Sequence, residues 1–205
     1  MRYLNKIVFI NSAAIRYSEV QLDGNIHLIG TQGVGKSTIL RAILFFYNAD
    51  TQRLGIPVEK KSYQDYYFPY ADSSIIYEVA REDGWFTVLS YKTMNRICYR
   101  FIASPYRPDL FIDEEGAPYP SDRIRSVLDK NGIKYSGAIS TYEEYRNILY
   151  GNSDNKRDYS CYSLMESGSY QNIIRTIQNV LLNSRLEADY IKQTIITSLN
   201  EADSV

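Results

Sequence analysis

Hydrophobic residues near the start of the chain fall into short runs separated by polar turns, a pattern typical of strands. Residues 3–10 predict a first strand, and residues 19–22 predict a second extended segment. Residues 26–29 form a nearly continuous apolar run, as in a strand buried on both faces of a sheet. From Lys36 to about Tyr47 the apolar residues recur with helical spacing. The sequence therefore predicts a strand, a glycine-rich loop and a helix in succession.

The middle of the chain predicts an antiparallel meander. Residues 75–80, 86–91 and 97–103 have strand-like composition and are separated by short polar turns. Residues 110–113 could extend this meander. A loop over residues 48–72 precedes it, and the length of this loop indicates an exposed or functional insertion.

Two short helices are predicted after the meander. Ser121 is placed to cap the first, which should end before Gly132. Thr141 and Glu144 form a capping-box pattern for the second, which should end near Gly151. The first helix has Ile124, Val127 and Leu128 on one face.

The last part of the chain predicts longer helices. Residues 170–181 follow helical spacing, and Ser184 with Glu187 forms a second capping-box pattern. This pattern opens a helix that runs to about Leu199.

Composition places the chain among folded domains. It has 205 residues, of which 44% are hydrophobic and 23% charged, which excludes a disordered chain. The net charge of −1 gives no overall attraction to nucleic acid, so such a partner would need a local basic patch. No apolar run is long enough to span a bilayer, so we expect a cytoplasmic protein without a membrane partner. Cys98 and Cys161 are expected to be reduced structural thiols.

The residues that carry the clearest chemistry lie between the apolar run at 26–29 and the helix predicted from Lys36. Eight consecutive residues match the phosphate-binding pattern GxxxxGK[ST] in full: Gly30-Thr31-Gln32-Gly33-Val34-Gly35-Lys36-Ser37. Glycines let the loop curl so that backbone N–H groups surround a phosphate, and the helix adds its positive dipole end. The alternative is a glycine turn with a solvated lysine.

This pattern assigns roles to individual residues in Mg-ATP binding. Lys36 would reach the β- and γ-phosphates, the Ser37 hydroxyl would coordinate Mg²⁺, and the Thr38 hydroxyl would lie near the α-phosphate. The predicted nucleotide-binding residues in this segment are Gly30, Gln32, Gly33, Val34, Gly35, Lys36, Ser37 and Thr38.

Phosphoryl transfer also requires an acidic metal ligand and a group that orients water. Residues 110–114 offer the local candidate, an apolar run followed by Asp113 and Glu114. In one interpretation they form a Walker B strand with Asp113 on Mg²⁺ and Glu114 as the base. In the other, Asp113 opens a hairpin turn, and Pro105 and Pro108 just before it disfavour a central strand.

Weaker signals concern nucleic acid. Lys60 and Lys61 lie beside Tyr63, Tyr66 and Tyr67, as in single-strand binders, although surface packing explains the same pattern. His27 is either a packed strand residue or a ligand. A DNA-facing surface or singly scattered residues would account for five arginines: Arg96, Arg100, Arg107, Arg123 and Arg125.

The first 38 residues resemble the opening of SMC/RecF-type ABC ATPase heads. The resemblance rests on residues 2–11, on residues 20–30 and on the Gly30-Thr31-Gln32-Gly33-Val34-Gly35-Lys36-Ser37-Thr38 loop. Phe68-Pro69-Tyr70 and Tyr77-Glu78-Val79 are further similar to SMC-like ATPases of Wadjet-type bacterial plasmid and phage defence systems.

The resemblance implies an α/β P-loop NTPase fold of the ABC/SMC head type, but only part of a head. It implies strands, P-loop and helix over 1–50, a tyrosine-rich loop over 51–74, antiparallel strands over 75–116 and a helical segment over 117–205. It places the 184–199 helix on the way to a coiled coil. It also implies a contact between Arg16 and adenine or phosphate, an alternative being a solvated loop arginine.

The sequence lacks other parts that this family uses. There is no LSGGQ-like signature segment, no convincing Walker B and no evident Q-loop glutamine. The resemblance therefore implies that a C-terminal head half or a second head completes the site, with DNA and accessory subunits as further partners.

Three functions follow from these observations. The first is an ATP-binding N-terminal part of an SMC/RecF-like ATPase acting on DNA, in which ATP drives head engagement. The second is a self-contained P-loop kinase or GTPase that uses Asp113 as a metal ligand. The third is a product that binds nucleotide and DNA without turnover.

Overall fold

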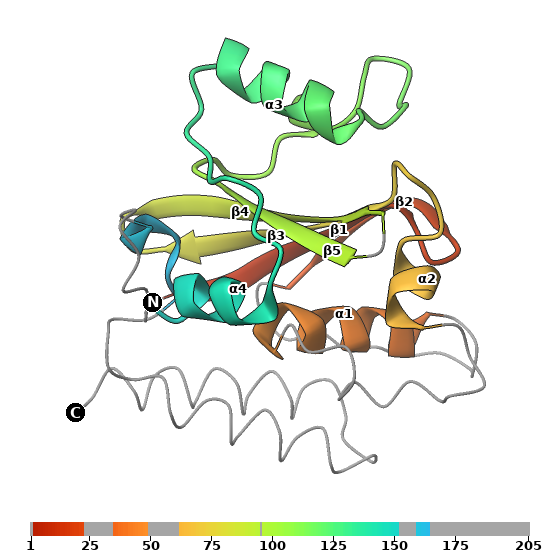
Figure 1. Cartoon of the computed structure of the whole chain (residues 1–205), viewed down its shortest axis with the longest axis horizontal. Helices are drawn as coiled ribbons and strands as arrows, with labels where there is room; N and C mark the ends of the chain where they lie inside the picture. The colour runs from red at the N-terminus through yellow and green to blue at the C-terminus, as the bar shows by residue number, and fades with distance from the viewer. Residues whose placement is uncertain (1, 23–34, 49–61, 95, 152–158, 165–205) are drawn as a thin grey trace.

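The computed structural model describes residues 2–22, 35–48, 62–94, 96–151 and 159–164. Within these ranges the chain is a mixed α/β structure built on one sheet, with helices on both of its faces (Figure 1). The strand predicted at 26–29 and the helices predicted after residue 170 lie outside the described residues. Among the helices that are described, not one has the length and apolar character needed to cross a bilayer.

The sheet has five strands in the order β2-β1-β3-β4-β5, and all neighbours are antiparallel. The predicted meander is confirmed. Its strands are β3 (Ser74–Arg81), β4 (Gly84–Thr93) and β5 (Arg96–Ile102). Most residues of these strands are buried, and their apolar side chains pack on both faces of the sheet. Their strand-like composition and the short turns between them were therefore sufficient to find them.

The first hairpin is longer than predicted. β1 spans Tyr3–Ser12 and β2 spans Ile15–Gln21, so β2 begins four residues before the predicted start at Glu19. Asn11 and Ala13 adopt positive φ angles of 44° and 53° at this hairpin. β2 is an edge strand with several exposed residues, and its polar composition therefore hid the backbone pairing that defines it.

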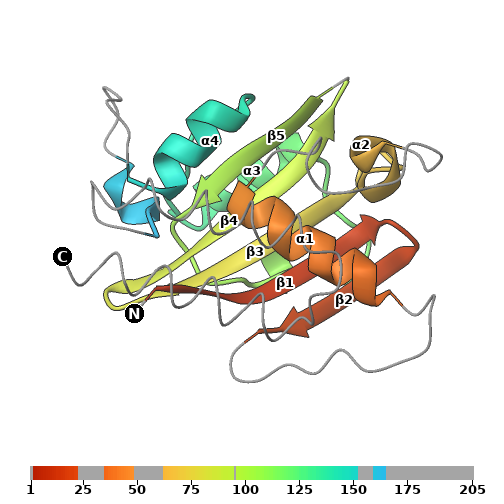
Figure 2. The same ribbon diagram turned by 90° about the horizontal axis from the view of Figure 1, so that it is seen from below.

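The larger core lies on one face of the sheet, under helices α1 (Lys36–Asn48), α2 (Tyr63–Tyr67) and α4 (Tyr142–Leu149) (Figure 2). The helix predicted from Lys36 to about Tyr47 is confirmed. α2 corrects the prediction of a loop over 48–72, because Tyr63 and Tyr67 are buried in this core and fold the segment back onto α1.

Buried tyrosine hydroxyls hold α1 in place. Tyr67 donates to the Thr38 carbonyl at 2.7 Å, and Tyr77 donates to the Ala42 carbonyl one turn later at 3.0 Å. At the other end, two tyrosine hydroxyls from α4 and its C-cap residue donate to carbonyls in the last turn, which have no helical partners: Tyr145 to Phe46 and Tyr150 to Tyr47. The helix is therefore fixed by hydrogen bonds as well as by apolar contacts.

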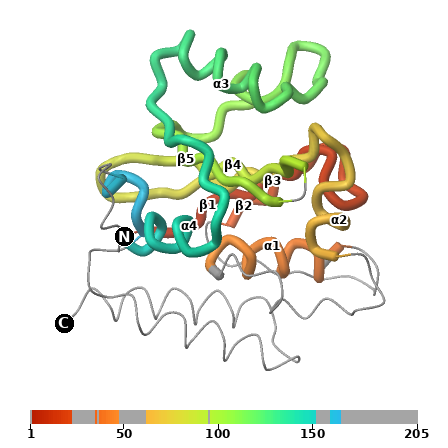
Figure 3. The backbone as a smooth tube through the Cα atoms, viewed as in Figure 1, coloured from red at the N-terminus to blue at the C-terminus, as the bar shows by residue number. Residues whose placement is uncertain are grey.

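A second, smaller core covers the opposite face. Residues 103–135 cross above the sheet and return, which the tube trace shows clearly (Figure 3). They contain a 3₁₀ turn, η2 (Pro108–Leu110), and the helix α3 (Ser121–Lys130). The predicted extension of the meander over 110–113 is wrong, because residues 108–110 form this turn and Ile112 makes only an isolated bridge to Pro118.

The two short helices lie where the sequence predicted them, but only one of the two predicted caps is confirmed. α4 is capped as predicted by the Thr141 hydroxyl, which accepts from the Glu144 backbone N–H at 3.2 Å. The predicted cap of α3 is wrong: Pro120 occupies the N-cap position and Ser121 is the first helical residue. The last element in the described residues is a 3₁₀ turn, η3 (Ser160–Tyr162), which lies beside α4.

Candidate nucleotide-binding site

The candidate site is at the start of α1. Gly35 precedes the helix with a φ of +86°, a conformation that glycine adopts without strain. Its carbonyl accepts the Ile39 N–H at 3.1 Å, the first hydrogen bond of the helix. Ser37 is exposed on the first turn. The predicted contacts at Gly30, Gln32, Gly33 and Val34, and also His27, lie outside the described residues.

The electrostatics of this helix end favour an anion. The first turn of α1 contains no acidic residue, so its own side chains do not neutralise the positive end of the helix dipole. The nearby α2 carries Asp65, but this carboxylate accepts from Lys92 Nζ at 3.1 Å and from the Ser62 hydroxyl at 2.7 Å. The start of α1 therefore has the polarity that a phosphate requires.

Thr38 connects the start of α1 to α2. Thr38 is buried, and its hydroxyl lies 3.0 Å from the Tyr66 hydroxyl. Its carbonyl accepts from the Tyr67 hydroxyl, so two consecutive tyrosines hold one residue of the helix. Sequence reasoning noted the tyrosine cluster but missed this contact, because nothing in the local pattern relates residues 66 and 67 to residue 38.

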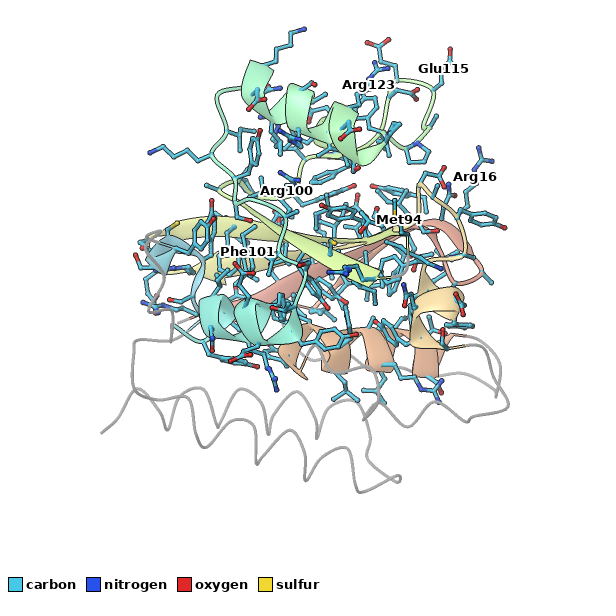
Figure 4. The ribbon with its side chains drawn as sticks, in the orientation of Figure 1. Arg16, Met94, Arg100, Phe101, Glu115 and Arg123 are labelled. Atoms are coloured by element: carbon cyan, nitrogen blue, oxygen red, sulfur yellow. The ribbon has the colours of Figure 1, made fainter. Side chains whose placement is uncertain are left out.

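Arg16 lies at the same end of the sheet as the start of α1. Arg16 is exposed on strand β2, so the prediction that it lies in a polar loop is wrong. The hairpin that carries it is tied to α2, because the Ser12 hydroxyl donates to the Tyr67 carbonyl at 2.8 Å. Figure 4 shows the Arg16 side chain on the side of the sheet that carries α3, so the structure does not bring it to the start of α1.

Asp113 and Glu114 lie on the other face of the sheet, in the layer formed by residues 103–135 (Figure 4, near Glu115). Asp113 Oδ1 accepts the backbone N–H groups of Glu115 at 3.0 Å and Ala117 at 2.7 Å. Its own N–H donates to the Ala117 carbonyl at 2.9 Å. These contacts match the hairpin-turn interpretation, and the structure does not bring Asp113 to Ser37.

The five arginines considered for DNA binding occupy different environments. Arg100 is buried between β5 and the upper layer, where its guanidinium lies 5.2 Å from the Tyr135 ring, so it is not part of a surface. Arg107 pairs with Asp109 at 2.6 Å, and Arg123 lies over the Tyr119 ring. Arg96 and Arg125 are exposed, whereas Lys60 and Lys61 lie outside the described residues.

The two cysteines also occupy different environments. Cys98 is a buried free thiol, whereas Cys161 is exposed. The part of the chain that the structure describes contains no group of three or more side chains suited to hold a metal ion.

A search of curated proteins finds no match to this chain. A family model described as "Protein of unknown function (DUF3584)" matches residues 11–205, which is nearly the whole chain. That family is associated with RecF/SMC-like proteins. The chain therefore belongs to the DUF3584 family.

Proposed function

We propose that this chain is the ATP-binding N-terminal part of an SMC/RecF-like ATPase that acts on DNA. The observation that carries the proposal is the complete GxxxxGK[ST] sequence, whose last residues lead directly into α1 through a positive-φ glycine. Membership of a family associated with RecF/SMC-like proteins supports it further.

In this proposal the start of α1 binds the phosphates of Mg-ATP. Lys36 contacts the β- and γ-phosphates, Ser37 provides a ligand to Mg²⁺, and backbone N–H groups of the loop surround the anion. The absence of acidic residues from the first turn of α1 favours this binding, because an adjacent carboxylate would repel the phosphates.

The proposal also assigns hydrolysis to a complete head rather than to this chain. Asp113 is engaged in its own turn on the far face of the sheet, so the acidic residues would come from a C-terminal head half or a second head. ATP would then hold two such halves together, and hydrolysis would release them. DNA and accessory subunits are the partners that fit this activity, in plasmid or phage defence as one setting.

Mg-ATP binding measured by calorimetry tests the proposal. We expect Lys36→Ala to weaken binding by about 100-fold or more, because it removes a charged hydrogen-bond donor worth about 3 kcal/mol. Lys130→Ala is the matched control, since Lys130 is exposed at the end of α3 on the other face of the sheet. If wild-type chain and Lys36→Ala give the same titration, the proposal is wrong.

Turnover by the Asp113→Asn variant separates this proposal from a self-contained kinase or GTPase. We expect Mg-ATP binding and any turnover to stay within about twofold of wild type, because asparagine keeps an oxygen that accepts the two turn hydrogen bonds. Robust turnover by the wild-type chain that Asp113→Asn abolishes would favour the self-contained enzyme. Binding with negligible turnover in both chains would fit the half-head.

A further inference from the structure

The hydroxyl contact between α1 and α2 has a directional consequence. Thr38 and Tyr66 place their hydroxyl oxygens 3.0 Å apart, and either oxygen is able to donate. A phenolic O–H is a stronger donor than an aliphatic one, which favours the orientation in which Tyr66 donates and Thr38 accepts. The Thr38 proton is then left for another acceptor.

Acceptance of a hydrogen bond also strengthens a hydroxyl as a donor, because hydrogen bonds in a chain polarise one another. The position of Thr38 would let this strengthened donor reach a bound phosphate. It follows Ser37 in the first turn of α1, where the helix end favours an anion. Tyr66 is held in place by its own helix, since the N–H of Tyr66 donates to the Ser62 carbonyl at 2.9 Å and Tyr67 is anchored to the Thr38 carbonyl.

We propose that Tyr66 is a positioning residue for the nucleotide, which acts by orienting and polarising the Thr38 hydroxyl toward a phosphate of the bound nucleotide. This inference rests on the proposed function, because it requires a nucleotide at the start of α1. It adds a residue from outside the phosphate-binding sequence, 28 positions further along the chain. It also gives α2 a role in binding beyond packing.

Calorimetric titration of the full 205-residue chain with Mg-ATP tests the inference. We expect Tyr66→Phe to weaken Mg-ATP binding about fivefold, the size expected for one ordinary hydrogen bond. The affinity for Mg-ADP should fall by the same factor, because ADP also carries the α- and β-phosphates. Tyr77→Phe is the matched control: it removes another tyrosine hydrogen bond to α1, at Ala42, and should change the affinity less than twofold.

A double-mutant cycle shows whether Tyr66 acts through Thr38. Thr38→Val should weaken binding, and Tyr66→Phe should then have no added effect. Equal affinities of Tyr66→Phe and wild type, or an undiminished effect of Tyr66→Phe in the Thr38→Val background, would overturn the inference. If Tyr66→Phe does not fold, the affinities of Thr38→Ser and Thr38→Val for Mg-ATP are compared instead. Thr38→Ser keeps a hydroxyl and should retain most of the affinity. Equal losses of affinity in the two variants would overturn the inference.

The failure of this inference differs from the failure of the proposed function. If wild-type chain binds Mg-ATP and Lys36→Ala does not, a null result for Tyr66→Phe removes only the role of Tyr66. If the wild-type chain shows no Mg-ATP binding, the proposed function fails and takes the role of Tyr66 with it.

Discussion

Raising the pH above about 10 is expected to unfold this chain steeply, because its core contains many neutral tyrosines. Burial raises the pKa of a set of tyrosine hydroxyls on the α1 side of the sheet above the ordinary value of about 10: Tyr63, Tyr67, Tyr77, Tyr99 and Tyr145. The charged phenolate is disfavoured in the apolar core. These groups therefore keep their protons in the folded chain at a pH where the unfolded chain loses them.

The sign of the effect follows from proton linkage. Above pH 10 the unfolded chain binds fewer protons than the folded chain, so the free energy of unfolding falls as the pH rises. Each such group contributes about 1.4 kcal/mol per pH unit between its unfolded and folded pKa values, and the five together contribute about 7 kcal/mol per pH unit. The free energy of unfolding of an ordinary domain, about 5–15 kcal/mol, would therefore fall to zero within about one to two pH units.

Urea unfolding followed by circular dichroism from pH 8 to pH 11 measures this. Stability should be level below pH 10 and then fall, with tyrosinate absorbance rising together with unfolding. Tyr99→Phe is a sharp control, because the buried Tyr99 hydroxyl has no hydrogen-bond partner among the described residues. This variant should lose about 1.4 kcal/mol per pH unit of the slope. A constant free energy of unfolding up to pH 11 would contradict the argument.

Replacement of Glu78 by alanine is expected to cost about 4 kcal/mol of stability, the largest effect of a single polar substitution that we predict. Glu78 is buried on β3, where its Oε1 accepts from Asn5 Nδ2 at 2.7 Å and its Oε2 accepts from the Tyr106 N–H at 2.6 Å. Loss of the carboxylate leaves two buried donors without partners, each costing about 1–3 kcal/mol. The Tyr106 contact also ties the upper layer to the sheet.

Urea unfolding at pH 7 measures the stability of Glu78→Ala, with Glu19→Ala as the control variant. Glu19 is a more exposed carboxylate on β2 that pairs with Lys6 at 2.9 Å, and loss of such a pair costs about 1 kcal/mol or less. The Glu78 variant should therefore unfold at a much lower urea concentration than the Glu19 variant. Equal midpoints for the two variants would mean that burial of the Glu78 carboxylate carries no special weight.

Local patterns in the sequence were enough to predict most of the regular elements, but not the short helix α2. The meander from β3 to β5, the helix from Lys36 and the short helix capped by Thr141 all follow from spacing and capping within a few residues. The edge strand β2 was predicted too short, because its pairing with β1 is a backbone property that polar side chains do not reveal.

The candidate site divides in the same way. The phosphate-binding sequence is contiguous, so Lys36, Ser37 and Thr38 could be named from the sequence alone. The contact of Tyr66 with Thr38, the burial of Arg100 and the separation of Asp113 from Ser37 by the sheet depend on how distant segments pack. The sequence by itself determined the meander, the helix from Lys36, the two short helices α3 and α4, and the phosphate-binding motif, because those signals are local. Only the tertiary structure decided which side chains meet, because such contacts are made between segments tens of residues apart.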